Sequence, residues 1–480
     1  MFRGRLPILA VVLILFAGCV ESEDPDIPRR RVVATPTGGQ STLVIGLVAT
    51  LSGGGVFGGE DALEGADLAV QLMNRSLAED RSPFELVTLD DQGEVARARH
   101  LVEELAASDR TVGIVYAGPP EALPELEPVL AEAGIPALLV YGDLYSPRRL
   151  TPHVFQMSPP FLWQSRRIAS YLLRDRRYEA VGALVERSFT GRSAWQSLRT
   201  ALGERDARAR VAIQYEPDRS DLRSSLQALK ARRVEAIVVH GPPEVLPALF
   251  DELREMDAIY RGTGRARTAS AARSVRIARR RKGVWRPQIV AYDLVLGPRP
   301  EASRYPPGTV AAASYARGVH YLPVPSFVAF RRAFGQWWDA RPLGLEVRSY
   351  DAARAIGTAA LRGVQQGDDL ARVLERLDAT RFGGLDIAFG PDDHTGVDQV
   401  SVGLWVVPRA DAWVRERDRL PPGLPWVPLA RGFSIDGTRT DIESKDWRHL
   451  FVNPPPPRAP APRVRRMRFG VTTPRSDPIH

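Results

Sequence analysis

The sequence predicts an α/β protein with two lobes, each built on a mainly parallel sheet that helices cover on both faces. Short apolar runs alternate with helical patterns from Leu43 onward, and this alternation begins again after Phe155. One segment of the first series, Gly118–Leu126, recurs in the second as Gly241–Leu249. Strands separated by helices of this length run parallel. Their right-handed crossovers bring the loops that follow the strands to one edge, where open α/β folds bind ligands.

The individual elements follow from hydrophobic periodicity. Strands are expected at residues 43–51, 84–89, 112–116, 135–141, 180–185, 211–215, 236–240, 288–292, 309–313, 385–389 and 400–407. Helices are expected at residues 60–75, 95–107, 123–133, 161–173, 193–203, 222–230, 243–256, 327–341 and 350–365. A chain of 480 residues is too long for one hydrophobic core, which also indicates two domains.

The repeated segment begins with Gly-Pro-Pro-Glu, at Gly118–Glu121 and at Gly241–Glu244. Each copy directly follows an apolar run and opens a predicted helix. Proline suits the first helical turn, where the N–H has no partner, and a glutamate there interacts favourably with the helix dipole. Two interpretations stay open: two good strand-to-helix turns, or two similar lobes that present equivalent loops to a shared cleft.

The N-terminus has the pattern of a secretory signal at residues 1–18. Arg3 and Arg5 precede the apolar run Leu6–Phe16, which is too short to span a bilayer comfortably. Phe16-Ala17-Gly18-Cys19 then resembles the lipobox of bacterial lipoproteins, in which the cysteine is lipidated and becomes the new N-terminus. An ordinary signal peptide with an incidental cysteine is the alternative.

Cys19 is the only cysteine, so an intrachain disulfide is excluded. Residues 19–42 are polar and without periodicity, which predicts a flexible tether between a membrane surface and a folded body. The Pro- and Arg-rich tail at residues 451–480 has no core of its own.

The basic charge of the chain is local. The net charge is +8, but residues 261–286 contain nine arginines, one lysine and no acid. The rest of the chain is therefore slightly acidic, at about −2. We interpret this stretch as a solvated surface insertion, with binding of anionic lipid or a partner as the alternative, and we do not expect the protein to bind nucleic acid.

The glycine-rich segment Gly53–Gly58 satisfies the GxGxxG pattern between a strand and a helix. A dinucleotide fold needs an acid about twenty residues further on. Here the strand-end acids Asp90 and Asp91 come about 32 residues after Gly58. A loop that exposes backbone N–H groups to an anion is therefore the better interpretation, and no cofactor is expected.

Hydrolytic motifs are absent from the sequence: it has no GxSxG, HExxH or P-loop pattern. Asp392-Asp393-His394 would suit a metal site or acid–base catalysis, but a turn after a strand is the favoured interpretation. We therefore predict a protein that is not an enzyme and holds no metal.

Several segments in order resemble the type I periplasmic binding proteins of the branched-chain amino acid class. They are Val44-Ile45-Gly46, Leu51-Ser52-Gly53, Gly65 with Leu68-Ala69-Val70 and Asn74, Leu86–Asp91, Ala133-Gly134-Ile135-Pro136, Val154-Phe155, Tyr350-Asp351-Ala352-Ala353 and Phe382-Gly383-Gly384. The resemblance spans Leu43 to Val407.

The resemblance implies two Rossmann-like lobes joined by a three-strand hinge, with capture of a small solute for an ABC importer. Lobe 1 would comprise residues 43–157 and 315–378. Lobe 2 would comprise residues 158–314 and 379–450, with the insertion at 261–286. A lipid on Cys19 would hold the protein at the extracytoplasmic side of the cell envelope, where an ABC permease would be its partner.

The resemblance also implies the ligand-binding residues. From lobe 1 these are Ser52, Gly53, Phe57, Gly118, Pro120, Tyr141, Gly142 and Asp143. From lobe 2 they are Phe189, Gly241, Pro243, Tyr292 and Asp293. Asp293 falls near the acid that pairs with a ligand ammonium in amino-acid binders of the family.

Two departures disfavour a standard aliphatic amino acid as ligand. Family members usually hold the ligand carboxylate with Ser or Thr hydroxyls at the lobe 1 turns, where this chain has Pro119-Pro120 and Tyr141-Gly142-Asp143. Proline lacks an N–H, and Asp143 would repel a carboxylate. We therefore expect an amino-acid-like or amide-like solute. The alternative is an envelope scaffold or regulatory lipoprotein with a degraded cleft, and a dinucleotide enzyme is the third hypothesis.

Overall fold

The structure is a computed structural model. It describes residues 30–32, 42–53, 58–77, 83–140, 152–203, 210–216, 218–256, 285, 287–293, 308–314, 319, 325–342, 344–363, 369–377, 380–384, 386–397, 401–406 and 427–428. The predicted signal, Cys19, the tail at 451–480 and all of the basic insertion except Trp285 lie outside these residues.

The first sheet has six strands in the order β1-β3-β2-β4-β5-β6. They are β1 (Arg30–Val32), β2 (Leu43–Ala49), β3 (Phe84–Asp90), β4 (Thr111–Ala117), β5 (Ala137–Leu139) and β6 (Val154–Gln156). All neighbours are parallel except β1, which pairs antiparallel with the edge strand β3. The predicted tether therefore includes a short strand, because the edge of β3 offers unpaired backbone groups.

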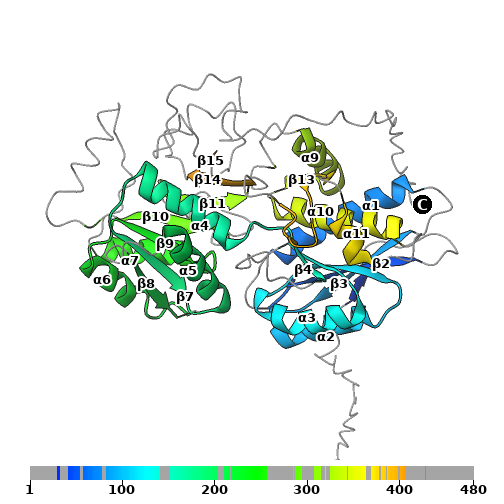
Figure 1. Cartoon of the computed structure of the whole chain (residues 1–480), viewed down its shortest axis with the longest axis horizontal. Helices are drawn as coiled ribbons and strands as arrows, with labels where there is room; N and C mark the ends of the chain where they lie inside the picture. The colour runs from blue at the N-terminus through cyan, green and yellow to red at the C-terminus, as the bar shows by residue number, and fades with distance from the viewer. Residues whose placement is uncertain are drawn as a thin grey trace, which may run out of the picture.

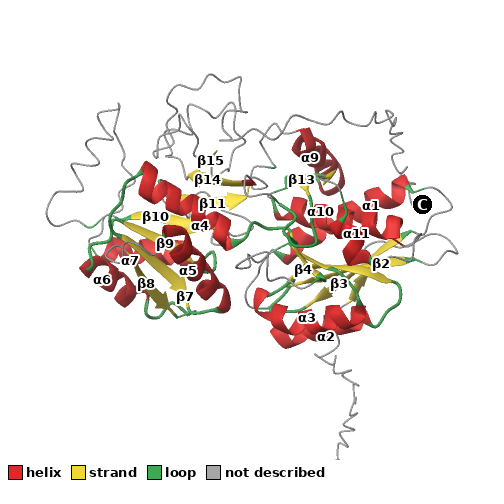
Figure 2. Cartoon of the chain, in the orientation of Figure 1, coloured by secondary structure: helices red, strands yellow, loops and turns green. Residues whose placement is uncertain are grey.

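Helices cover both faces of this sheet (Figure 2). α1 (Gly59–Ser76) and α10 (Leu345–Gly363) pack together on one face, and α2 (Val95–Ala106) and α3 (Leu123–Ala133) on the other. α9 (Pro325–Trp338) contacts α1, and α11 (Leu370–Glu375) contacts α10. Alternate residues of β2 enter opposite cores, since Ile45 and Leu47 pack in one hydrophobic cluster and Val44 and Val48 in the other.

The second sheet has seven strands in the order β15-β14-β11-β10-β9-β7-β8. They are β7 (Val181–Glu186), β8 (Arg210–Tyr215), β9 (Ala236–His240), β10 (Gln288–Tyr292), β11 (Val310–Ser314), β14 (Val402–Val406) and β15 (Val427–Pro428). α4 (Phe161–Ser170) packs with α5 (Phe189–Leu202), and α6 (Leu222–Ala231) packs with α7 (Val245–Glu255). Figure 1 shows the two sheets with their helices as two lobes side by side.

The chain passes between the lobes after β6, after β11 and before β14. The last of these connections pairs with the first: Gln156 N–H donates to the His394 carbonyl at 2.8 Å, and Gly396 N–H donates to the Gln156 carbonyl at 2.8 Å. The His394 ring stacks on Phe155, with Nδ1 3.0 Å from the Val154 carbonyl oxygen. Asp392 and Asp393 thus lie in a turn, as predicted, and His394 packs where the first and last connections between the lobes meet.

Several boundaries differ from the sequence expectation. α5 begins at Phe189 because the Ser188 hydroxyl accepts a hydrogen bond from Gly191 N–H and so caps the helix. α10 begins at Leu345, earlier than its apolar pattern indicates, because its first turn packs against α1. The expected strand at 385–389 shrinks to β13 (Asp386–Ile387), which pairs with β12 (Thr380–Arg381).

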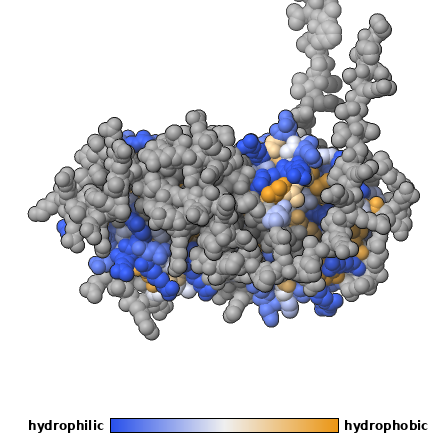
Figure 3. Space-filling model, turned by 90° about the horizontal axis from the view of Figure 1, so that it is seen from above, coloured by the Kyte–Doolittle hydropathy of each residue, from blue (hydrophilic) through white to orange (hydrophobic). Residues whose placement is uncertain are grey.

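The visible described surface is largely polar. In Figure 3 hydrophilic residues predominate among the coloured atoms, and Leu173 and Val328 are the exposed large hydrophobic residues among those described. Within the described part of the chain, no helix is both long and apolar enough to cross a membrane.

The contact between α1 and α10 depends on Gly65. A Cβ atom at Gly65 would overlap the Glu346 carbonyl oxygen and the Ser349 hydroxyl. Gly65→Ala should therefore force the helices apart and lower the free energy of unfolding by about 1–3 kcal/mol, measured by urea denaturation. Gly335→Ala in α9 is the control, because the nearest atom there lies at 3.5 Å, and it should be neutral or slightly stabilising. Equal losses in both variants would contradict the packing argument.

Candidate functional site

The loop after β2 is held by the acid that ends β3. Asp90 Oδ1 accepts hydrogen bonds from the N–H groups of Leu51, Ser52 and Gln92 at 3.0, 3.2 and 3.0 Å, and Oδ2 accepts from the Ser52 hydroxyl at 2.5 Å. Burial acts to raise the pKa of Asp90, but these donors together hold it below its ordinary value. The predicted ligand residue Ser52 therefore donates its hydroxyl proton within lobe 1, and Gly53 beside it is exposed.

Asp91, the next residue, is fully buried. Its Oδ1 accepts from the Thr50 hydroxyl at 2.7 Å and from Gly93 N–H at 2.8 Å, whereas Oδ2 has no hydrogen-bond partner. Burial, followed by the charge of Asp90, raises the pKa of Asp91 to about 6. A Cβ on Gly118 would overlap Oδ2, so this free oxygen lies against the first residue of the repeated turn.

The first Gly-Pro-Pro-Glu turn contains the short 3-10 helix η1 (Pro120–Ala122). Tyr116 of β4 donates its hydroxyl proton to the Pro119 carbonyl at 2.8 Å. A side chain at Gly118 would also approach this hydroxyl, at 2.8 Å. The turn is thus tied to the strand that leads into it, and its backbone is buried.

The second turn has a similar support. Tyr215, at the end of β8, donates its hydroxyl proton to the His240 carbonyl at 3.1 Å, and a Cβ on Gly241 would overlap the Tyr215 hydroxyl. Pro243 is half-buried and Glu244 is exposed. Each turn therefore has a glycine that fits against a buried tyrosine hydroxyl, a likeness beyond what strand-to-helix turns require.

The first turn meets lobe 2 directly, because η1 packs against α5. The predicted residue Pro120 begins η1, and the predicted residue Phe189 begins α5, so this contact brings their two elements together. Glu121 projects from η1, and Glu186 ends β7 just before α5. The charge of Glu121 acts on Glu186 from the other lobe.

The charges here are mainly acidic. Burial raises the pKa of Glu121, and the charge of Arg192 acts against this rise. Burial also raises the pKa of Glu186; repulsion from Glu121 and Glu244 adds to the rise, while a hydrogen bond from Ser188 and the charge of Arg219 oppose it. Arg192 and Arg219 therefore offset part of the charge of these two carboxyls.

Tyr292 is fully buried within lobe 2. Its hydroxyl donates to the Ala194 carbonyl at 3.1 Å and lies 2.7 Å from the Ser165 hydroxyl. Its ring packs edge to face on His240 and Phe161. Both ring nitrogens of His240 are without a hydrogen-bond partner, and burial lowers its pKa to about 3, which keeps the ring neutral. The Tyr292 hydroxyl therefore forms its contacts within lobe 2, and contact of Tyr292 with a ligand stays a prediction.

Asp293, which follows Tyr292, already has a cation beside it. Arg348 of α10 donates from Nη2 to Asp293 Oδ2 at 2.5 Å, and both side chains are buried. Gln164 of α4 accepts from Asp293 N–H at 3.0 Å. Asp293, which was expected to bind a ligand ammonium, is thus paired with Arg348 of the other lobe, since α10 belongs to the first lobe and β10 to the second.

Four of the predicted site residues, Phe57, Tyr141, Gly142 and Asp143, lie outside the described residues. The structure adds Asp91, Glu121, Glu186 and Arg348. The first three have a sequence signal, because Asp91 and Glu186 come just after predicted strands and Glu121 belongs to the repeated Gly-Pro-Pro-Glu segment. Arg348 has none, since it precedes the first residue of its predicted helix.

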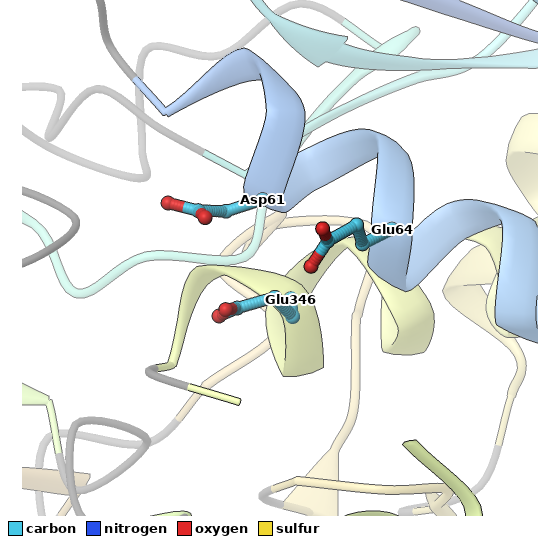
Figure 4. Close-up of side chains that lie close together, drawn as sticks. All are labelled: Asp61, Glu64 and Glu346. Atoms are coloured by element: carbon cyan, nitrogen blue, oxygen red, sulfur yellow. The ribbon is translucent and has the colours of Figure 1, made fainter. Parts of the chain in front are cut away.

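A separate group of acids lies between α1 and α10. Asp61, Glu64 and Glu346 lie close together in Figure 4, with carboxylate oxygens within 4.8 Å of one another. Glu346 accepts a hydrogen bond from Gly344 N–H at 3.0 Å, and each of the three has a further interaction within the protein. The group therefore does not consist of free ligands.

The comparisons with known proteins agree with this architecture. A periplasmic binding protein family model matches residues 42–273. No curated protein matches the chain by sequence.

Solved structures resemble the chain at low sequence identity. A branched-chain amino acid transporter substrate-binding protein from Streptococcus pneumoniae, solved with isoleucine, is 16% identical, with a TM-score of 0.59 over 76% of this chain and 95% of its own. A periplasmic binding protein type 1 from Bordetella pertussis is 16% identical, with a TM-score of 0.65 over 81% and 100%. A solute-binding protein of an ABC transporter from Rhodopseudomonas palustris, solved with 3,4-dihydroxybenzoic acid, is 16% identical, with a TM-score of 0.60 over 78% and 94%. At this identity the likeness concerns the fold.

The raised pKa of Asp91 gives a testable pH dependence. The folded protein binds a proton on the Asp91 carboxylate more tightly than the unfolded chain does. The stability that this proton contributes is therefore full below about pH 4 and is lost as the pH rises through about 6. Asp91→Asn should remove this loss. The free energy of unfolding of the variant, taken relative to the wild type, should therefore increase by up to roughly 3 kcal/mol from pH 4 to pH 7, measured by urea denaturation at each pH.

Asp90→Asn is the matched control for this experiment, because the pKa of Asp90 is lowered and the sign reverses. This variant should be destabilised at pH 7, and its deficit should shrink as the pH falls. The same pH trend in both variants would contradict the assignment.

The ion pair between Arg348 and Asp293 gives another prediction. Arg348→Met leaves the buried charge of Asp293 unpaired, and Asp293→Asn leaves that of Arg348 unpaired. Each variant should therefore lower the free energy of unfolding by about 3–5 kcal/mol. The double variant should lose less than the sum of the two. Arg99→Met, which breaks the exposed pair with Glu103, should cost less than about 1 kcal/mol. Additive losses in the double variant would show that the pair is not coupled.

Proposed function

We propose that the chain, which matches a periplasmic binding protein family model over residues 42–273, is the solute-binding protein of an ABC importer. Its role is to capture a small polar solute between the two lobes. The observation that carries this proposal is the meeting of the first Gly-Pro-Pro-Glu turn with α5 of the other lobe. Both lie at the carboxyl ends of parallel strands, where open α/β sheets bind ligands.

The proposed ligand is amino-acid-like or amide-like, and a standard aliphatic amino acid is disfavoured. Pro119 and Pro120 offer no N–H to a ligand carboxylate, and Asp293 is paired with Arg348. The similar structures hold isoleucine in one case and 3,4-dihydroxybenzoic acid in another. The fold is therefore compatible with solutes of different chemistry.

The proposal includes a lipid anchor on Cys19 at the outer face of a membrane, with the segment that follows as a tether. Its support is the lipobox-like run Phe16–Cys19. The partner would be an ABC permease that receives the solute from the lobes. Radiolabelled palmitate incorporation that Cys19→Ala abolishes would test the anchor.

One observation favours a second function, that of an envelope scaffold with the same fold. The acid expected to bind a ligand ammonium is occupied by a side chain of the protein itself. A scaffold would bind a protein partner and no small solute, and this binding would depend on the basic insertion at 261–286 or on the tail at 451–480.

A thermal-shift screen of the full chain separates these functions. A solute that binds only the folded protein, present at 100 times its Kd, should stabilise it by about 2.7 kcal/mol and raise Tm by several degrees. The screen should contain amino acids, amides, amines and aromatic acids, and calorimetry should confirm 1:1 binding. Deletion of residues 261–286 is the control and should leave the shift unchanged. The absence of any shift, with partner capture that this deletion abolishes, would favour the scaffold.

A further inference from the structure

The short strand β1 joins the first sheet at its edge and runs against the direction of the other strands. It pairs antiparallel with β3, in a register that places Arg30 opposite Leu89 and Val32 opposite Val87. β2, β3 and β4 run parallel to one another. The first residue of β1 therefore lies at the carboxyl end of β3, and its last residue lies toward the middle of that strand.

The carboxyl end of β3 belongs to the edge at which the solute is proposed to bind. Asp90, which directly follows Leu89, holds the loop after β2 by accepting hydrogen bonds from the N–H and the hydroxyl of Ser52. The first Gly-Pro-Pro-Glu turn follows β4 at the same edge, because these strands are parallel. The chain that precedes β1 consequently leaves lobe 1 at its solute-binding edge.

Without β1 the tether would leave lobe 1 from the opposite side. The next strand is β2, whose first residue, Leu43, pairs with Phe84, the first residue of β3. A tether attached only through Leu43 would therefore leave at the amino ends of the strands. The two edges lie about 20 Å apart, since β3 has 7 residues and a strand rises about 3.3 Å per residue.

The segment between the proposed lipid anchor and β1 is short on this scale. Arg30 follows Cys19 by eleven positions, whereas Leu43 follows it by twenty-four. A chain of the shorter length spans about 40 Å at most, and a flexible chain of that length has an average end-to-end distance of about 20 Å. With the amino edge toward a membrane, Arg30 would lie at least about 20 Å from the lipid surface. That orientation restricts the segment to its extended conformations and costs chain entropy.

We propose that β1 orients the protein on a membrane. The lipid on Cys19 and the pairing of β1 with β3 hold lobe 1 with its solute-binding edge toward the bilayer. This inference rests on the proposed lipid anchor and extends it from attachment to orientation. The surface that faces the lipid consists of the loops after β2, β3 and β4. A permease in the same membrane thus meets the edge at which the solute is bound.

Hydrogen exchange on the full chain tests the pairing itself. Adjacent N–H groups of a strand point in opposite directions, so Arg31→Pro combined with Val32→Pro removes the hydrogen bond to β3 whichever residue donates it. Backbone amides at residues 87–89 should exchange about tenfold faster in this double variant. Thr35→Pro combined with Thr37→Pro lies outside β1. It is the matched control and should leave this exchange unchanged.

Energy transfer in liposomes that carry an acceptor dye on the lipid headgroups measures the orientation. A donor dye is attached to the lipidated chain at Glu94→Cys, beside the carboxyl end of β3, or at Asp109→Cys, beside the amino end of β4; both positions are exposed. Cys19 is the only other cysteine and carries the lipid, so each variant has one reactive thiol. The donor at Glu94→Cys should lie about 20 Å closer to the bilayer. The double proline variant should reverse this order, because its chain leaves at the amino edge.

The outcomes separate the orientation from the other parts of the proposed function. Equal distances for the two donors, or the same order in the wild type and in the double proline variant, would overturn the orientation. Unchanged exchange at residues 87–89 in that variant would overturn the pairing on which it depends. A chain without lipid on Cys19 would overturn the orientation together with the proposed anchor. Solute binding is measured separately by the thermal-shift screen and stands in each case, and an unchanged Tm shows that every variant folds.

Discussion

The buried ion pair between Arg348 and Asp293 fixes how the two lobes meet. Arg348 lies on α10, which packs on the first sheet, and Asp293 follows β10 of the second. Burying either charge alone costs several kcal/mol, so each lobe supplies the opposite charge that the buried residue of the other lobe requires. Gln164 of α4 binds the backbone of Asp293 as well. The pair thus joins α10, α4 and β10, and the connection after β6 leads directly into α4. Separating the lobes exposes both charges to water, which makes their contact both specific and reversible.

With the lobes held at this point, the loops at the carboxyl ends of the strands determine what lies between them. Parallel sheets place these loops on one edge in each lobe, and the connection through Gln156 and His394 links the lobes by backbone hydrogen bonds. η1 then contacts α5 at this edge. The charges of Glu121 on η1 and of Glu244 on the second turn both add to the raised pKa of Glu186, whereas the charge of Arg219 opposes the rise.

The fold was predictable from the sequence because strands buried on both faces leave continuous apolar runs. β9 and β10 have the predicted bounds for this reason, and α3 has them because its C-terminus coincides with Gly134. β1 was not predictable, since its pairing comes from the free edge of β3 and not from its own residues. The site was predictable only in part. The repeated turn and the strand-end acids leave a local signal, but the pairing of Asp293 with Arg348 joins residues 55 positions apart. Such a contact follows from how the lobes pack, and no local pattern encodes it.

The Arg348 guanidinium beside Asp293 also bears on what the protein selects. An acid that is already neutralised from within the chain no longer distinguishes a ligand ammonium from a neutral group. Where η1 contacts α5, the charge of Glu121 is partly offset by Arg192 and that of Glu186 by Arg219, and Asp91 has an oxygen without a hydrogen-bond partner. The prolines of the turn also bear on this selection, because each removes an N–H that would hold an anion. A turn with Gly-Pro-Pro-Glu therefore keeps the shape of the strand-to-helix connection while it offers fewer N–H groups to an anion.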